Sequence, residues 1–265
     1  MADVVVVERL AVAQSADHVA TVTLNRPDKL NALNAAMWKA VGDAFEELGA
    51  DMTVRCVVLR GAGERAFSPG ADIAEFQTAR ADGAQAARYG ALMHRAMGAI
   101  GDCPHPTLAA ICGVCVGGGL ELAAMCDLRL CGESSRFGVP INRIGVVMAY
   151  PEMAALIALV GRATALEILF EGRVFDAAEA RAKGLVTRVV ADDRVFAEAQ
   201  AAAARIAEGA PLVNRWHKKF LCRLMAGAPL TAAEAAEGFA AFDTADYREG
   251  VRAFLAKEKP RFEGR

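Results

Sequence analysis

A glycine turn followed by a glutamate is the stretch of this sequence best suited to chemistry. It lies within residues 111–127, ICGVCVGGGLELAAMCD, where Gly117, Gly118 and Gly119 precede a helical pattern and Glu121 falls in its first turn. A turn without β-carbons lets an outside group approach the backbone, and a helix start offers unpaired N–H groups and the positive end of the helix dipole. An oxygen that becomes negative would be stabilised there, and the Glu121 carboxylate could move a proton beside it.

Short apolar stretches on both sides of the glycine turn are predicted to be the buried strands that position it. Upstream, Asn34 is a plausible N-cap, and AFSPGADI at 66–73, with Pro next to Gly, is expected to be a loop. The strands are predicted at 4–10, 18–25, 54–60, 107–112 and 127–131, and the helices at 33–48 and 82–100.

Helical patterns dominate the chain after Pro140, with one strand predicted at 185–190. We therefore expect an α/β core over residues 1–195 and a helical C-terminal region over 196–265. No Ser/Gly-rich linker separates them, so the helical region should pack on the core or on a neighbouring subunit. The helices are predicted at 152–160, 163–171, 176–183, 192–208, 211–225, 231–242 and 245–257.

Composition excludes several classes of protein. With 265 residues, 54% of them apolar, the chain can bury a large core, and a net charge of −2 gives no electrostatic footprint for nucleic acid or an anionic membrane. The start, MADVVVVERL, lacks the pattern of a secretory signal, and the longest apolar runs are shorter than the roughly 18 residues that span a bilayer. We expect a soluble, cytoplasmic protein.

Seven cysteines raise the question of metal or redox chemistry, because Cys112 and Cys115 form a C-x-x-C and His105 lies near Cys103. A zinc site would need a second Cys or His pair at a compatible distance, and a redox motif would place the cysteines at the start of a helix. Cys115 leads instead into the glycines. We interpret these cysteines as small buried side chains in a reducing compartment and expect no metal.

Two glycine-bearing loops, AFSPGADI and GVCVGGGLEL, each follow a predicted buried strand. Together they resemble the signature of the crotonase (enoyl-CoA hydratase/isomerase) superfamily, and the likeness extends over nearly the whole chain. The resemblance implies an α/β fold built as a spiral of ββα units with two roughly perpendicular sheets, a helical C-terminal part used in trimer formation, and acyl-CoA thioesters as ligands. The further matching segments are LNRPDKLNAL, CDLRL, FGVPINRIG, GRVFDAAEARAKGLV and REGVRAFLAKEKPRF.

The resemblance assigns an oxyanion hole to the backbone N–H groups of Ala71 and Gly118, and a catalytic carboxylate to Glu121. Two N–H donors aimed at a thioester oxygen would stabilise an enolate, and losing one such donor costs roughly 10²- to 10³-fold in rate. Without the resemblance, AFSPGADI could equally be a surface loop, the glycines a close-packing turn, and Glu121 a residue that only complements the helix dipole.

One position departs from the hydratase pattern, in which a second glutamate follows a proline about twenty residues after the first. Here Ile141 follows Pro140, and isoleucine transfers no proton. Either Glu121 serves as base and acid in turn, or another group reaches the acyl chain. The candidates are Asn142, Arg143, Tyr150 and Glu152, each of which also has a structural interpretation in a loop or at a helix start.

The resemblance also implies where coenzyme A binds. Its adenine would lie against Lys29, Leu30 and Ala32 and against Asp72 and Ile73, and Lys257 on the last helix would contact its phosphates. Coenzyme A is then part of the substrate, and no separate cofactor is expected. Beside the thioester, the same ligand would contact Gly70, Gly117, Pro140 and Ile141.

The leading hypothesis is an acyl-CoA enzyme that stabilises a thioester enolate, most simply an enoyl-CoA hydratase. The change at Ile141 keeps decarboxylation, isomerisation and hydrolysis open, each with one catalytic glutamate. A hypothesis of another class is a non-catalytic binding protein with the same fold. For the assembled protein we expect a homotrimer or a dimer of trimers.

Overall fold

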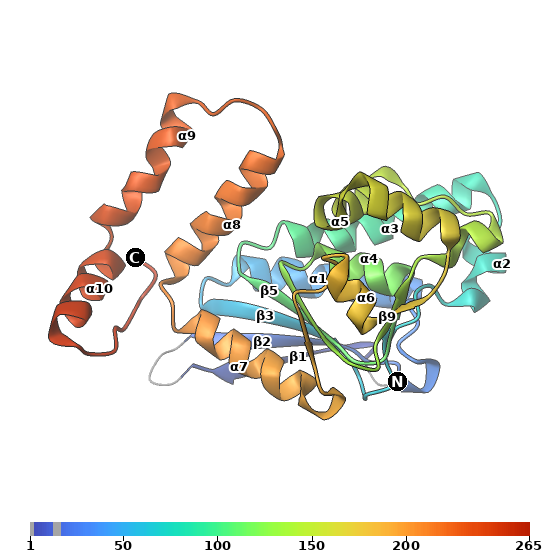
Figure 1. Cartoon of the computed structure of the whole chain (residues 1–265), viewed down its shortest axis with the longest axis horizontal. Coiled ribbons are helices and arrows are strands. Elements are labelled where there is room, and N and C mark those ends of the chain that lie inside the picture. Colours follow the sequence, from blue (N-terminus) through green and yellow to red (C-terminus); the bar gives the residue numbers. More distant parts are fainter. Residues whose placement is uncertain (1–2, 13–16) are drawn as a thin grey trace.

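Two sheets organise the molecule in the computed structural model, which describes residues 3–12 and 17–265 (Figure 1). The six-stranded sheet has the order β1-β2-β3-β5-β7-β10, and the four-stranded sheet has the order β4-β6-β8-β9. The strands are β1 (Val5–Ala11), β2 (His18–Leu24), β3 (Val54–Gly61), β4 (Ala66–Ser68), β5 (Thr107–Ile111), β6 (Val114–Val116), β7 (Leu128–Gly132), β8 (Arg136–Gly138), β9 (Phe175–Asp176) and β10 (Arg188–Val190).

Most strand pairs are parallel, as expected where helices connect successive strands. In the larger sheet only β1 and β2 pair antiparallel, and in the smaller sheet only β8 and β9 do so. The α-helices are α1 (Ala35–Ala50), α2 (Phe76–Ala79), α3 (Gly83–Gly101), α4 (Gly118–Met125), α5 (Tyr150–Glu171), α6 (Ala177–Ala182), α7 (Val195–Ala207), α8 (Pro211–Met225), α9 (Ala232–Glu237) and α10 (Ala245–Ala256).

Helix α1 begins where the sequence predicted. The Asn34 side chain accepts a hydrogen bond of 2.9 Å from the Met37 N–H, which satisfies one of the unpaired donors of the first turn. The expected loop at 66–73 is partly wrong, because Ala66–Ser68 forms β4. A strand of three residues is too short to show an alternating pattern, so its pairing with β6 decides its structure.

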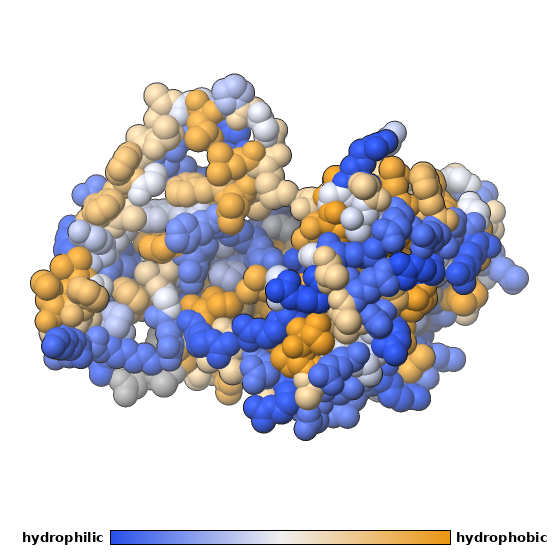
Figure 2. All heavy atoms as spheres, viewed as in Figure 1, coloured by the Kyte–Doolittle hydropathy of each residue, from blue (hydrophilic) through white to orange (hydrophobic). Residues whose placement is uncertain are grey.

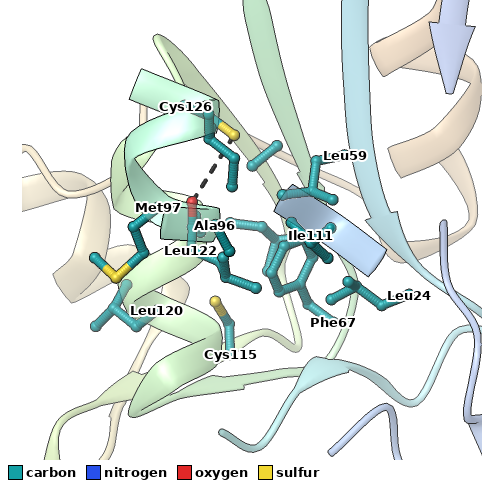
Figure 3. Packing of buried hydrophobic residues seen from close by; sticks show 14 of the residues in the cluster. Leu24, Leu59, Phe67, Ala96, Met97, Ile111, Cys115, Leu120, Leu122 and Cys126 are labelled. Atoms are coloured by element: carbon teal, nitrogen blue, oxygen red, sulfur yellow. Dashed lines mark hydrogen bonds between the residues drawn. The ribbon is translucent and has the colours of Figure 1, made fainter. Parts of the chain in front are cut away.

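Both faces of the larger sheet are covered, which explains why the middle of β3, residues 56–59, is apolar without interruption. Val57 and Leu59 point into the core beneath α1 and α3, whereas Cys56 and Val58 alternate onto the opposite face against α7. Figure 3 shows part of the core beneath α1 and α3. Side chains from the larger sheet, from β4 and β6 and from α3 and α4 meet there; they include Leu59, Phe67, Cys115 and Leu122.

Helix α5, of 22 residues, consists of two helical segments joined at a kink, in agreement with the two helices predicted at 152–160 and 163–171. Its backbone leaves the helical region at Gly161, where φ is +74°. By length and composition, α5 is the single helix of the described chain that would reach across a bilayer. It carries Glu152 in its first turn and Arg162 just after the break, and charges within an apolar span are costly. We therefore describe α5 as a helix that packs on the protein, against α4.

The C-terminal helices α8, α9 and α10 extend away from the sheets as an arm (Figure 1). Helix α7 lies within the region 196–265 that the sequence assigns to the C-terminal part, yet it packs on the larger sheet through Ala199 and Ala203. Apolar residues line the arm (Figure 2). Its exposed large apolar side chains are Leu221, Leu224, Met225, Leu230, Phe239, Phe242, Tyr247, Val251, Phe254 and Leu255.

Candidate active site

Three neighbouring strands of the smaller sheet bring together loops that are far apart in sequence. β4, β6 and β8 are parallel, so their carboxyl ends meet at one edge. The loop after β4 carries Gly70 and Ala71, β6 leads into Gly117 and Gly118, and β8 leads into 140–144. Ligands of α/β proteins bind beside the carboxyl ends of parallel strands. The topology therefore places all three candidate loops at one site.

The first two loops touch through their backbones. Gly70 has a φ of +97°, and a β-carbon on it would lie 2.9 Å from the Val116 carbonyl oxygen and 3.0 Å from the Gly118 nitrogen. Real β-carbons do not approach backbone atoms so closely, and L side chains rarely adopt that φ. Glycine at this position therefore allows Ala71 and Gly118 to lie next to one another.

Ala71 and Gly118 each present a backbone N–H without a partner in the part of the chain that the structure describes. The Leu33 N–H donates to the Gly70 oxygen at 2.8 Å, and the Asp72 N–H donates to the Leu33 oxygen at 2.9 Å. These bonds use the residues on either side of Ala71 and leave the Ala71 N–H itself unused. Gly118 is the first residue of α4, where an N–H has no helical acceptor. Two such donors can hold an oxyanion.

Glu121 lies in the first turn of α4 and is buried, with 8% of its surface exposed. Its carboxylate has no hydrogen-bond or ion-pair partner within residues 3–12 and 17–265. The pKa of Glu121 is raised to about 7, chiefly by burial and in addition by the negative charge of Glu152, while Arg80 acts in the opposite direction. A carboxyl group that titrates near neutral pH can both take and give a proton.

Ile141 occupies the third loop, in a 3-10 helix that spans Pro140–Ile144, and it packs against the main core. It brings no acid to the site. Among the alternatives, Asn142 donates to the Phe170 carbonyl at 2.8 Å, which is a structural role, and Tyr150 is 90% exposed. Arg143 is exposed as well. Glu152 is the remaining candidate, and it is buried.

The predicted adenine-binding segment has an unusual backbone beside Asp72. Leu30 and Asn31 both lie in the left-handed region, with φ of 53° and 62°. Arg26 joins the segment to the oxyanion loop, donating to the Ala32 oxygen at 2.7 Å and to the Asp72 carboxylate at 2.8 Å. Arg26 thus links Ala32, in one predicted adenine-binding segment, to Asp72 in the other. That adenine binds between these segments stays a prediction.

Asn31 is a residue of this region that sequence reasoning missed. Its side chain donates to the Ala62 and Ala66 oxygens at 3.0 and 2.9 Å and accepts from the Arg26 N–H at 3.1 Å. Asparagine tolerates left-handed backbone better than most residues, which was the available signal.

Lys257 is not brought to this site within one chain. It ends α10 with a φ of 56° and is exposed. Figure 1 places α10 on the arm at one end of the molecule and α2 at the opposite end, with α4 between them and nearer to α2.

The cysteines of the C-x-x-C motif are buried as free thiols. Burial raises the pKa of Cys112 to about 11 and that of Cys115 well above its ordinary value. Such thiols are poor nucleophiles at neutral pH. No group of three potential metal-binding His, Cys, Asp or Glu side chains occurs among residues 3–12 and 17–265.

Comparison with known proteins assigns the family. The model of the enoyl-CoA hydratase/isomerase family matches residues 14–265. A probable enoyl-CoA hydratase of Rhizobium meliloti is 38% identical and is aligned over 93% of this chain and 95% of its own length. The chain belongs to the enoyl-CoA hydratase/isomerase family. It is an enzyme of this family, and its sequence resemblance to the crotonase superfamily is confirmed.

Two further relatives extend the comparison. The short-chain-enoyl-CoA hydratase of Clostridium acetobutylicum is 33% identical, over 91% of this chain and 92% of its own. The crystal structure of an enoyl-CoA hydratase/carnithine racemase from Magnetospirillum magneticum superposes with a TM-score of 0.95 at 53% identity, covering 100% of this chain and 97% of that one. The predicted crotonase fold is thereby confirmed.

Proposed function

We propose that the protein hydrates 2-enoyl-CoA thioesters, adding water across the double bond through an enolate. The proposal depends on one arrangement at the start of α4. The buried Glu121 carboxyl, with a pKa near 7, lies in the first turn of this helix. The N–H of Gly118, the first residue of the helix, is one of the two backbone donors without a partner among the described residues, and the N–H of Ala71 is the other. The thioester oxygen would accept hydrogen bonds from Ala71 and Gly118. The names of the relatives from Rhizobium meliloti and Clostridium acetobutylicum support this substrate class.

In the reaction, water adds to C3 while the electrons of the double bond move onto the thioester oxygen. The two N–H donors stabilise that oxygen more strongly as its negative charge grows, which lowers the barrier. Glu121 transfers a proton between water and the acyl chain, and protonation at C2 returns the electrons from the oxygen. No separate cofactor enters these steps.

The test is hydration of crotonyl-CoA, followed by loss of the absorbance of the conjugated thioester. Glu121→Gln should lower kcat by about 10²- to 10⁴-fold, the usual contribution of a general acid or base. Glu171→Gln is the matched control, because this glutamate at the end of α5 is exposed and pairs with Arg173. Wild-type turnover that survives Glu121→Gln unchanged would refute the assignment.

A second candidate function is decarboxylation, which Ile141 favours. Loss of CO₂ itself delivers an enolate to the oxyanion hole, so an apolar residue at that position would not obstruct the reaction. Absence of hydration, together with CO₂ release from a malonyl-type CoA ester, would support it. Binding of CoA esters without turnover of either substrate would instead support a non-catalytic binding protein.

For the assembled protein we propose a homotrimer, or a dimer of trimers, in the cytoplasm. The exposed apolar side chains of the arm would be buried between subunits, as large apolar patches commonly are. In such an assembly Lys257 of one subunit could reach coenzyme A bound to another, because Lys257 follows α10, which lies on the arm and away from α2 (Figure 1).

A further inference from the structure

Glu152 is a buried carboxylate with one oxygen unused. It lies in the first turn of α5 with 5% of its surface exposed. One oxygen is 3.0 Å from Nε2 of His94, on α3, and the other has no hydrogen-bond partner in the part of the chain that the structure describes. An unpaired buried acceptor costs about 1–3 kcal/mol, and more when it is charged.

A structural role does not explain this arrangement. A glutamate in the first turn complements the helix dipole from the protein surface and does not need to be buried. The contact with His94 uses one oxygen only, and among residues 3–12 and 17–265 no donor reaches the second oxygen. Buried polar atoms without partners in native proteins are often the groups that bind a ligand.

The unpaired oxygen belongs to the neighbourhood of Glu121. Helix α4 packs against both α3 and α5, and Figure 1 shows the three helices on the same side of the molecule. The charge of Glu152 is felt at Glu121, where it acts after burial in the same direction. Arg80, whose guanidinium stacks 4.7 Å from the centre of the Tyr89 ring, is the cation that opposes it.

We propose that Glu152 is the second catalytic carboxylate of this active site and that His94 is its positioning residue. The proposal rests on the proposed hydration of 2-enoyl-CoA thioesters. The proposal also explains how the site could function with Ile141 in the loop after β8, where the hydratase pattern has a glutamate. The second carboxylate comes instead from the first turn of α5. In this proposal the unused oxygen of Glu152 accepts a proton from the water to be added, and Glu121 delivers a proton to the acyl chain.

The proton balance follows from these roles. Glu152, as carboxylate, takes one proton from water while the remaining hydroxide forms its bond to C3. The double-bond electrons move to the thioester oxygen, and Glu121, protonated at the start, gives its proton to C2 as the enolate collapses. One water has then been added, Glu152 carries a proton and Glu121 has lost one. Transfer of a proton from Glu152 through solvent to Glu121 restores the starting state.

His94 suits the positioning role. Its side chain is 38% exposed, so it joins the buried carboxylate to the solvent. A hydrogen bond from Nε2 fixes one Glu152 oxygen and leaves the other directed elsewhere. In the tautomer with the proton on Nε2, His94 donates this hydrogen bond and the Glu152 carboxylate accepts it.

The experiment compares Glu152→Gln, His94→Gln and the control Glu171→Gln in crotonyl-CoA hydration over a range of pH. We expect Glu152→Gln to lower kcat by about 10²-fold or more with little change in KM, and to remove one limb of the pH profile. His94→Gln should lower kcat by about tenfold and shift that same limb. Thermal unfolding of each variant reports whether it folds as the wild type does.

Two outcomes separate this inference from the proposed function. If the wild type hydrates crotonyl-CoA and Glu152→Gln retains activity within about threefold, the inference fails and the proposed function stands. If the wild type has no hydratase activity, both the proposed function and the role of Glu152 in hydration fail. In that case a carboxyl titration followed by infrared spectroscopy tests separately whether Glu152 and Glu121 interact. Glu152→Gln should move the Glu121 transition to lower pH, and an unchanged transition would show that they do not interact.

Discussion

Gly70 and Gly118 lie so close that a β-carbon on Gly70 would be 3.0 Å from the Gly118 nitrogen. This contact joins the loop after β4 to the start of α4 and fixes the spacing of the two donors that would hold a thioester oxygen. This close contact is possible because residue 70 is a glycine and has no β-carbon. The same β-carbon would also meet the Val116 carbonyl oxygen, and neither backbone atom can move without displacing β6 or α4.

Gly70→Ala should therefore inactivate the enzyme while leaving it folded. The added methyl must separate the two loops, which displaces at least one oxyanion donor and should lower kcat/KM by about 10²-fold or more. The measurement is hydration of crotonyl-CoA together with the melting temperature. Gly63→Ala is the matched control, because Gly63 has a φ of +73° but no atom within 4 Å of a β-carbon. Equal activities of the two variants would show that the close approach has no role in catalysis.

The sequence predicted the longer elements because their signals are local. The N-cap at Asn34, the apolar run of β3 and the helical spacing of α8 are readable from neighbouring residues alone. The short strands of the smaller sheet carry no such pattern. β6 has only three residues, and its pairing with β4 and β8 comes from tertiary structure.

The same division applies to the candidate site. Ala71, Gly118 and Glu121 could be predicted because two loop motifs mark them. The burial of Glu152 against His94 could not, because α3 and α5 are far apart in sequence and are brought together by tertiary packing. From the sequence, Glu152 is an ordinary acidic residue after Pro151 at a helix start.

The pKa of Glu121 predicts how stability depends on pH. Its folded value of about 7 exceeds the ordinary value of 4.5, so the folded protein binds the proton more tightly. The contribution of protonated Glu121 to the free energy of unfolding is fully present below the ordinary pKa of 4.5 and is lost as pH rises through the folded pKa of about 7. The glutamine of Glu121→Gln cannot ionise. Near pH 9 the free energy of unfolding of this variant should therefore exceed that of the wild type by up to about 3 kcal/mol, whereas near pH 5 the two free energies should be similar.

Urea unfolding of Glu121→Gln at both pH values measures this difference. Glu152 and Arg80 face the same carboxyl and remain in the variant, so the change reports on Glu121 itself. The exposed control Glu171→Gln should show no comparable dependence on pH. A stability difference between Glu121→Gln and wild type that stays constant across this range would contradict a pKa raised by burial.

The arm predicts that assembly depends on its apolar side chains. Phe254 is 82% exposed on α10 and Leu224 is 58% exposed on α8. If these surfaces are buried between subunits, Phe254→Glu or Leu224→Glu places a charge in an apolar interface and should dissociate the assembly. Light scattering after size-exclusion chromatography gives the mass. Leu10→Glu, at a 63% exposed position on β1, is the control. A wild type that elutes as a monomer would refute the proposed assembly.

Asn31→Ala should damage both stability and binding of coenzyme A. Asn31 is 1% exposed, and its side chain holds the Ala62 and Ala66 carbonyl oxygens and the Arg26 N–H while its own backbone is left-handed. Removing the amide leaves buried polar groups unpaired and makes that backbone less favourable, for a cost of about 3 kcal/mol.

Because Asn31 lies between Leu30 and Ala32, the variant should also raise KM for crotonyl-CoA more than it lowers kcat, as expected for a loss of binding that substrate and transition state share. Asn25→Ala is the matched control, since the Asn25 side chain makes one exposed hydrogen bond within the described residues, to the Asp3 oxygen at 2.9 Å. Urea unfolding and steady-state kinetics on both variants test the two effects separately. A fall in kcat at unchanged KM would mean that Asn31 supports the oxyanion loop, through Ala66 at its base, and not the segment predicted to bind coenzyme A.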